Sequence, residues 1–175
     1  TKNIPILGTS VTSYGVALGI DGWKGGAVGG NVSGTSDLAP LDEQAAMVKE
    51  IFPDTKNVGI IYCSSEPNSK YQADVITDHF KDLGIEVKTY TFSDSNDVAS
   101  VTKSACDDSD VIYIPTDNTA ASCAKAINNV ALKAEVPIIA GEEGICSGCG
   151  VATLSISYYD LGYTTGEMAY DILVN

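Results

Sequence analysis

The sequence predicts an α/β fold with a parallel sheet, because apolar runs of strand length alternate with segments of helical periodicity. Three of these runs, at residues 58–63, 111–115 and 136–140, are continuously apolar, as expected for strands that are covered on both faces. Each run leads directly into polar residues. Ligands of open parallel sheets bind outside the carboxyl ends of the strands, so the sequence also predicts one small polar ligand at that edge.

The first elements are a short strand at 5–9 and a small apolar segment that extends to residue 20. The glycine-rich stretch 22–34 indicates an irregular connection. The expected elements that follow are a helix at 37–52, a strand at 58–63, a helix at 69–83 ended by Gly84, a strand at 85–92, a helix at 96–106, a strand at 111–114, a helix with the stripe Ala120, Ala124, Ile127 and Ala131, a strand at 136–140 and a strand at 151–156.

The two ends do not fit this single sheet. A last helix is expected from residue 158 to the terminus, with Leu161, Thr165, Met168 and Ile172 on one face. The glycine-rich stretch separates the first strand from the main alternation. Both terminal pieces are consistent either with extra elements of one domain or with parts of a second lobe.

The charge balance excludes several classes of partner. Hydrophobic residues make up 44% of the chain against 19% charged residues, which is enough for a packed core. The formal net charge of -13 argues against binding to nucleic acid. All basic residues are lysines, so an anion would be held by backbone N–H groups, hydroxyls or lysine rather than by arginine. No apolar stretch approaches the roughly 20 residues of a membrane helix.

The cysteines predict no metal site. Cys63, Cys106 and Cys123 lie in apolar contexts in which a free thiol packs as a small hydrophobic group. Cys146 and Cys149 form a C-x-x-C pattern in a glycine-rich loop, which is consistent with a redox pair, half a zinc site or a local disulfide. A zinc site would need two further ligands. We therefore expect a structural loop, with no metal and no cofactor.

The polar turns after the strands supply the candidate site residues. Backbone N–H groups at 64–69 make an anion site at a helix start, although capping by Asn68 or Ser69 explains those two residues equally well. The turn 116–119 offers the same choice, with Asn118 or Thr119 as the cap. Surplus carboxylates at this edge would repel one another, which favours a bound cation, either Mg²⁺ or an ammonium group, or a general acid/base pair. These carboxylates are Glu66, Asp117, Glu142 and Glu143.

Four separated motifs carry a resemblance to a known family. They lie at residues 29–37, 62–69, 115–119 and 139–162, and they are similar to the family of ABC-transporter substrate-binding proteins that includes tryptophan- and tyrosine-binding lipoproteins. The resemblance implies a two-lobed periplasmic-binding-protein fold of type I. It implies that residues 1–33 end an incomplete lobe 1, that 34–156 form a complete lobe 2, and that 157–175 are a helix that returns to lobe 1, with hinges near Gly34 and Ser157.

The resemblance also implies roles for individual residues. The turn from Gly141 to Gly144 is similar to an acidic turn that holds an α-ammonium group, and Glu143 is the expected contact. Ser10 and Thr12 match a strand end that places hydroxyls against a ligand carboxylate. Many relatives continue there with Asp-Pro, whereas this chain has Ser13 and Tyr14, so the ligand does not follow from the family alone. Tyr158 and Tyr159 could supply an aromatic wall.

The sequence therefore predicts the extracytoplasmic solute-binding component of an ABC importer, a periplasmic protein or cell-surface lipoprotein whose signal and anchor would precede Thr1. It would bind a small amino acid-like ligand in an interlobe cleft without catalysis and deliver it to ABC permease subunits. Alternatives are a flavodoxin-like Mg²⁺-dependent enzyme domain, or a sugar-binding or sensory domain of the same fold. A dimer of the fragment through its lobe 1 segments is a further expectation. The expected ligand contacts are Ser10, Thr12, Ser64, Ser65, Glu66, Asn68, Ser69, Thr116, Asp117, Asn118, Glu142 and Glu143.

Overall fold

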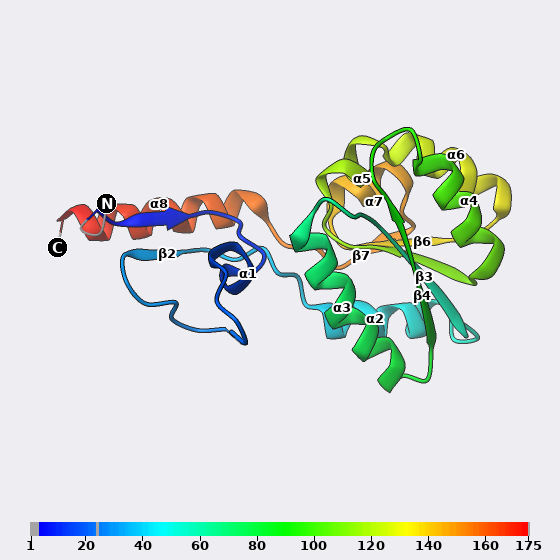
Figure 1. Cartoon of the computed structure of the whole chain (residues 1–175), viewed down its shortest axis with the longest axis horizontal. Coiled ribbons are helices and arrows are strands. Elements are labelled where there is room, and N and C mark those ends of the chain that lie inside the picture. The colour runs from blue at the N-terminus through cyan, green and yellow to red at the C-terminus, as the bar shows by residue number, and fades with distance from the viewer. Residues whose placement is uncertain (1–3, 24, 175) are drawn as a thin grey trace. The chain divides into compact units, whose positions relative to one another are not determined.

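The computed structural model describes residues 4–23 and 25–174. They divide into two compact units (Figure 1). The first, here called the sheet unit, consists of residues 39–155. The second, here called the terminal unit, consists of the residues up to 38 together with those from 156 onward. Each unit is described by itself.

The sheet unit contains a five-stranded sheet in which every pairing is parallel. In spatial order its strands are β4 (Glu86–Phe92), β3 (Asn57–Cys63), β5 (Val111–Ile114), β6 (Ile138–Ala140) and β7 (Ala152–Thr153). Counted from β3 along the chain, the order is 2-1-3-4-5, the order of flavodoxin-like doubly wound sheets. The predicted α/β class with a parallel sheet is therefore confirmed.

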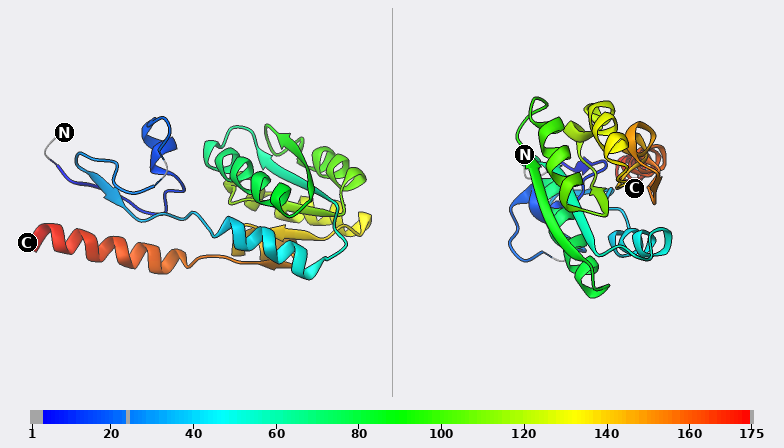
Figure 2. Two further views of the ribbon diagram at one scale, coloured as in Figure 1. Left: turned by 90° about the horizontal axis from the view of Figure 1, so that it is seen from below. Right: turned by 90° about the vertical axis from the view of Figure 1, so that its right-hand side faces the viewer.

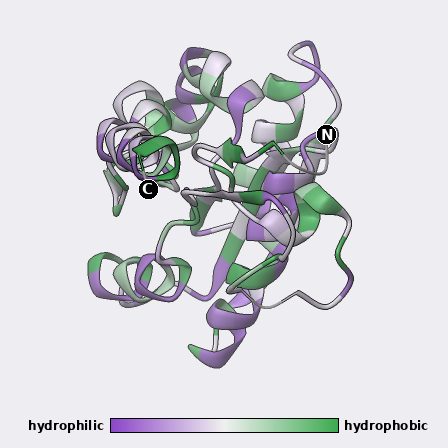
Figure 3. Ribbon diagram, turned by 90° about the vertical axis from the view of Figure 1, so that its left-hand side faces the viewer, coloured by the Kyte–Doolittle hydropathy of each residue, from purple (hydrophilic) through white to green (hydrophobic). Residues whose placement is uncertain are grey.

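Helices cover both faces of this sheet (Figures 1 and 2). One core lies under α2 (Leu41–Ile51) and α3 (Pro67–Asp82), and it receives Ile60 and Tyr62 from β3. The other core receives Ile61 and Cys63, because successive side chains of a strand point to opposite faces. The helices over this second core are α4 (Val98–Asp108), α5 (Asn118–Ser122), α6 (Ala124–Ala134) and α7 (Glu143–Cys149). Hydrophobic and hydrophilic residues both recur along the helices, as expected for elements with one buried face (Figure 3).

Two expectations for the second half of the sheet unit are wrong. The helix expected around residues 120–131 is two helices, α5 and α6, which meet at Cys123. The glycine-rich segment after β6, expected to be a loop, contains α7. This helix forms because the side chain of Glu142 caps its first N–H groups. Gly148 also permits a close approach to α6, since a Cβ there would lie 2.5 Å from the Cβ of Ala124.

The terminal unit consists of β1 (Ile6–Gly8), α1 (Tyr14–Leu18), β2 (Val32–Gly34) and α8 (Tyr158–Val174). β1 and β2 pair in parallel, so the stretch expected to be an irregular connection ends in a strand. Gly34 has a φ of 145°, and a Cβ there would overlap the carbonyl oxygen of Gly8 and the hydroxyl of Tyr14. Only glycine fits at this position. The hydroxyls of Thr35 and Thr165 lie 2.9 Å apart and join the end of β2 to α8.

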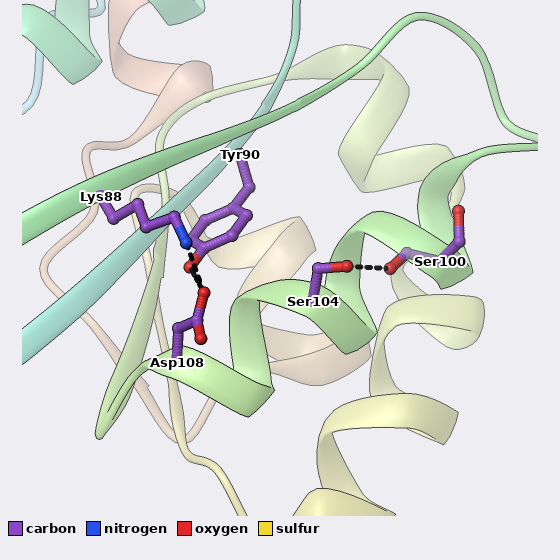
Figure 4. A network of polar contacts seen from close by, with 5 residues as sticks. All are labelled: Lys88, Tyr90, Ser100, Ser104 and Asp108. Atoms are coloured by element: carbon purple, nitrogen blue, oxygen red, sulfur yellow. Dashed lines mark hydrogen bonds and ion pairs between the residues drawn. The ribbon is translucent and has the colours of Figure 1, made fainter.

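A surface network joins the edge strand β4 to the end of α4 (Figure 4). The carboxylate of Asp108 accepts hydrogen bonds from the ammonium group of Lys88 and from the hydroxyl of Tyr90, the latter at 2.8 Å. The hydrogen bonds from Lys88 and Tyr90 lower the pKa of Asp108, and the charge of Lys88 adds to this effect. Because both members of the ion pair are exposed, it contributes little to stability. Among the helices that the structure describes, none has the length and apolar character needed to cross a bilayer.

Candidate functional site at the carboxyl edge of the sheet

The candidate site lies where the strand order reverses, between β3 and β5. The chain leaves β3 toward α3 on one face of the sheet, and it leaves β5 toward α5 on the other face. In doubly wound sheets, ligands usually bind outside the carboxyl ends of the two strands at which the connections diverge in this way. Two of the predicted polar turns, 64–69 and 116–119, occupy this position.

The carbonyl oxygen of Thr116 is the point where the two turns meet. It lies within hydrogen-bonding distance of three side-chain donors: the Ser69 hydroxyl at 3.0 Å, Gln72 Nε2 at 3.2 Å and Asn68 Nδ2 at 3.3 Å. The backbone N–H of Thr116 donates in turn to Gln72 Oε1 at 3.2 Å. A carbonyl oxygen has two lone pairs, so three donors compete for them. Ser69 and Gln72 are fully buried, whereas Asn68 is half-buried.

Glu66 bridges the same two turns. Its Oε1 accepts from the backbone N–H of Thr119 at 2.8 Å and from the Thr119 hydroxyl at 2.7 Å. Its Oε2 accepts from the backbone N–H of Asn118 at 3.0 Å and from Asn118 Nδ2 at 3.2 Å. Burial acts to raise the pKa of this carboxyl, but the hydrogen bonds from Thr119 and Asn118 outweigh it, so the pKa of Glu66 is lowered.

Asp117 is the cap of α5 and is almost completely buried. Its Oδ1 accepts from the backbone N–H of Ala120 at 2.7 Å, and its Oδ2 accepts from the backbone N–H of Cys63 at 2.8 Å. Burial raises the pKa of Asp117, and the nearby charge of Glu66 adds to this effect. The cap residues expected from the sequence are therefore wrong. Asp117 caps α5 instead of Asn118 or Thr119, and α3 begins after Glu66 with Pro67 in its first turn instead of at Asn68 or Ser69.

The third predicted turn, 141–143, lies against Thr116. The backbone N–H of Gly141 donates to the carbonyl oxygen of Ile114 at 2.7 Å, and a Cβ on Gly141 would lie 2.8 Å from the backbone nitrogen of Thr116. The carboxylate of Glu142 accepts from the backbone N–H groups of Gly144 and Ile145. Glu143 is exposed in the first turn of α7. The structure therefore brings all three turns of the sheet unit to one edge.

The carboxylates at this edge do not require a cation to balance them. Glu66, Asp117 and Glu142 each accept hydrogen bonds from backbone N–H groups of the chain itself. Glu143 remains exposed at the edge. In the part of the chain that the structure describes, no three His, Cys, Asp or Glu side chains gather in a way that could hold a metal ion.

The remaining expected contacts have other neighbours. The Ser64 hydroxyl donates to the carbonyl oxygen of Phe92 at 3.2 Å, and the Ser65 hydroxyl lies 3.1 Å from Cys63 Sγ. Ser10 and Thr12 belong to the terminal unit. The backbone N–H of Ser10 donates to the Thr35 hydroxyl at 3.3 Å, and Thr12 is buried.

The partner of the Thr12 hydroxyl is Asp37, a buried carboxyl group that was not predicted from the sequence as part of a site. The Thr12 hydroxyl donates to Asp37 Oδ1 at 2.7 Å, and the Tyr158 hydroxyl donates to Asp37 Oδ2 at 3.3 Å. Burial raises the pKa of Asp37, although both hydroxyl donors oppose the shift. The three residues join three distant segments of the terminal unit.

Two glutamines were also missed. Gln72 holds Thr116, as described above. Gln44 is fully buried in α2; its Nε2 donates to the carbonyl oxygens of Gly141 at 3.2 Å and Leu154 at 2.8 Å, and its Oε1 accepts from the Tyr113 hydroxyl at 2.5 Å. The available signal was an amide side chain within the apolar stripe of each helix, because a polar group at a buried position needs partners nearby.

Comparison with known proteins places these features in a family. The family model described as ABC transporter substrate binding protein matches residues 1–174. A curated protein of Clostridioides difficile strain R20291, named tyrosine-binding protein, is 40% identical over 176 residues, which cover 99% of this chain and 50% of that protein. The chain thus spans about half the length of this relative.

Solved structures agree with this assignment. An ABC domain from Streptococcus pneumonia in complex with L-Trp superposes with a TM-score of 0.88 at 31% identity, over 99% of this chain and 59% of the other. A ligand-free, open substrate binding protein with adhesive properties from Clostridium difficile has a TM-score of 0.74 at 38% identity, over 99% of this chain and 58% of the other. A LacI family transcriptional regulator from Bifidobacterium animalis, at 14% identity and a TM-score of 0.60, shares the fold alone.

Proposed function

Because the chain belongs to the family of ABC transporter substrate-binding proteins, we propose that it is part of the solute-binding component of an ABC importer and that it binds a small amino acid with an aromatic side chain. The observation that carries this proposal is the 40% identity, along 99% of the chain, to a protein named for binding tyrosine. The similar structure solved with L-Trp bound supports the same class of ligand.

The edge of the sheet unit suits the polar part of such a ligand. Asn68 is the most exposed of the three donors that share the Thr116 carbonyl oxygen, so it can turn toward a ligand carboxylate while Ser69 and Gln72 keep that oxygen satisfied. The exposed carboxylate of Glu143 lies on the neighbouring turn and can accept from an α-ammonium group. These two residues are our proposed contacts for the two charges of the amino acid.

The whole protein would act by binding alone. We propose that it works outside the cytoplasm, as a lipoprotein or a periplasmic protein, and delivers its ligand to ABC permease subunits without catalysis. The sheet unit would correspond to lobe 2, expected at residues 34–156. The segments 1–33 and 157–175 would belong to lobe 1, with Ser10, Thr12 and the aromatic ring of Tyr159 as further candidates for ligand contact.

Calorimetry on the full-length protein tests the proposal. The titrants are tyrosine, tryptophan, phenylalanine, several aliphatic and acidic amino acids, a set of sugars, and Mg²⁺ alone. We expect saturable binding of at least one aromatic amino acid. If only sugars bind, the ligand is a sugar rather than an amino acid. Stabilisation by Mg²⁺ together with turnover of a phosphoester would favour an enzyme instead.

A pair of variants tests the proposed ammonium contact. Glu143→Gln should weaken binding of the amino acid by about tenfold or more, because it removes a charge-assisted hydrogen bond. Glu43→Gln, which changes another exposed glutamate in the first turn of a helix, α2, is the matched control and should bind as the unchanged protein does. Equal affinities for both variants would exclude Glu143 as the contact.

A further inference from the structure

The proposed function leaves one motif unused, the C-x-x-C pattern of Cys146 and Cys149. Both residues lie in the last turn of α7 rather than in a loop, and both side chains are half-buried against the hydrophobic cluster on that face of the sheet. Both thiols are free in the structure. Two thiols one helical turn apart raise the question of whether they can be joined.

The backbone distance is compatible with a disulfide. Residues three apart in an α-helix have Cα atoms about 5 Å from each other, given a rise of about 1.5 Å per residue and a radius of about 2.3 Å. Disulfide-linked residues have Cα separations of about 4.4–6.8 Å. The Cβ atoms of such a pair are about 5–6 Å apart in a helix and must approach to about 3.5–4.5 Å, so the turn has to tighten.

The position in the helix makes this tightening feasible. Cys149 is the last residue of α7, and the final turn of a helix commonly adopts 3₁₀ geometry, in which side chains three residues apart eclipse each other. Cys149 Sγ already donates to the carbonyl oxygen of Ile145 at 3.4 Å, so it is directed back along the helix, toward the preceding turn. A Cβ on Gly150 would lie 3.2 Å from Cys146 Sγ, so the glycine leaves room for that sulfur beside the end of the helix.

We propose that Cys146 and Cys149 are a thiol modification site, which a low-molecular-weight disulfide such as oxidised glutathione converts into an intrahelical disulfide. The thiolate of Cys146 attacks one sulfur of glutathione disulfide. This step forms a mixed disulfide between Cys146 and one glutathione and releases the other glutathione as its thiolate. The thiolate of Cys149 then attacks Cys146 Sγ and releases the second glutathione. Two protein thiols are thereby oxidised, and one glutathione disulfide is reduced to two glutathione molecules.

The order of the two steps follows from the surroundings of each thiol. Burial raises the pKa of Cys149 to about 12, and burial also raises the pKa of Cys146. The thiolate is the attacking species, and Cys149, with the more strongly raised pKa, holds less of it. Cys146, whose sulfur lies beside Gly150 at the helix end, therefore reacts first. Both raised values predict a slow reaction that speeds up as the pH rises.

The disulfide would lie at the end of α7, the same helix whose first turn belongs to the candidate site. Glu142 caps α7 and Glu143 lies in its first turn, while Gly148 is pressed against Ala124 of α6. The inference itself does not depend on the identity of the ligand, and thiol counting decides it separately from any binding measurement.

The test uses the full-length protein in glutathione buffers of increasing oxidising strength. Remaining thiols are alkylated and counted by mass, and the linked peptide is mapped. We expect two thiols to become protected together, the link to map to Cys146 and Cys149, and a reducing agent to restore both. Cys149→Ser should retain glutathione on Cys146 instead of forming an internal link, whereas Cys146→Ser should react with glutathione disulfide much more slowly, because Cys149 holds little thiolate.

The matched control is Cys123→Ser, which changes another half-buried cysteine packed against the same cluster. It should form the disulfide as the unchanged protein does. The proposal is overturned if both thiols of the unchanged protein remain alkylatable at every buffer composition, or if the mapped link joins other cysteines. Should a serine variant fail to fold, as checked by circular dichroism, the peptide map of the unchanged protein still decides.

Discussion

The carboxylate of Glu66 accepts hydrogen bonds from both the backbone N–H and the hydroxyl of Thr119, which lies 53 residues further along the chain. Glu66 ends the turn after β3, and Thr119 lies in the first turn of α5. The pair therefore joins the two connections that diverge at the reversal of strand order. Its loss should loosen these two turns before the rest of the sheet unit.

Glu66→Gln should destabilise the protein by about 1.5–3 kcal/mol at neutral pH, the usual contribution of hydrogen bonds to a charged group. The pKa of Glu66 is lower in the folded state than in the unfolded state, so its stabilisation is present above the unfolded value and is lost as the pH falls through the folded value. The difference between the variant and the unchanged protein should therefore shrink in acid. Urea unfolding at neutral and at acidic pH measures it.

Glu43→Gln is the control for this prediction, because Glu43 is exposed on α2. It should leave the unfolding midpoint nearly unchanged at both pH values. A penalty for Glu66→Gln that stays constant down to strongly acidic pH would contradict the assigned direction of the pKa shift.

Gln44→Met should destabilise the protein by more than about 2 kcal/mol, since each buried polar group left unpaired costs about 1–3 kcal/mol. The change removes the acceptor of the Tyr113 hydroxyl and the donor to the carbonyl oxygens of Gly141 and Leu154. Thermal unfolding measures the effect.

Two companion variants sharpen this prediction. Gln72→Met should cost less: it leaves the backbone N–H of Thr116 without its acceptor, but the Thr116 carbonyl oxygen keeps Ser69 and Asn68 as donors, whereas Gln44→Met removes the partners of three groups. Tyr113→Phe added to Gln44→Met should recover part of the loss by removing the unpaired hydroxyl. A cost for Gln72→Met equal to or above that for Gln44→Met would show that the ranking by remaining partners is wrong.

Gly34→Ala should disrupt the pairing of β1 and β2, because the added methyl group would overlap backbone and the Tyr14 hydroxyl at a φ that L-residues rarely adopt. Gly30→Ala, at another positive φ but in open space, should cost only about 1–2 kcal/mol. Hydrogen exchange of the β1 and β2 amides compares the two variants, and similar protection in both would disprove the steric argument.

Asn68→Ala should weaken binding of the amino acid ligand about tenfold or more while leaving the unfolding temperature nearly unchanged. The Thr116 carbonyl oxygen retains two donors, so stability is spared, but the proposed donor to the ligand carboxylate is lost. Asn129→Ala, an exposed change on α6, is the control for calorimetry. Unchanged affinity in Asn68→Ala would remove this residue from the proposed site.

The sequence predicted the fold well because its signals are local and redundant. The apolar runs that became β3 and β5 are buried on both faces, and such runs have few alternatives to a central parallel strand. The same logic placed the three turns at one edge, because parallel strands end on the same side. Gly84 at the end of α3, with a φ of 73°, also follows the expected pattern.

The detailed roles within the turns could not be predicted, because they depend on contacts between distant segments. The position of Glu66 shows that it follows a strand, but not that Asn118 and Thr119 take up both of its oxygens. For the same reason, Asp117 could not be identified as a cap that also reaches Cys63. The helix α7 was missed because its glycines lower intrinsic helix propensity, while capping and packing against α6 favour the helix.

The outer position of β4 has a consequence for handling the protein. An unprotected edge strand of seven residues can pair with strands of other molecules and start aggregation. In β4, the exposed charged side chains of Glu86 and Lys88 disfavour such pairing. Concentrated solutions should therefore resist fibre formation, and neutralising these two charges would be the first way to lose that protection.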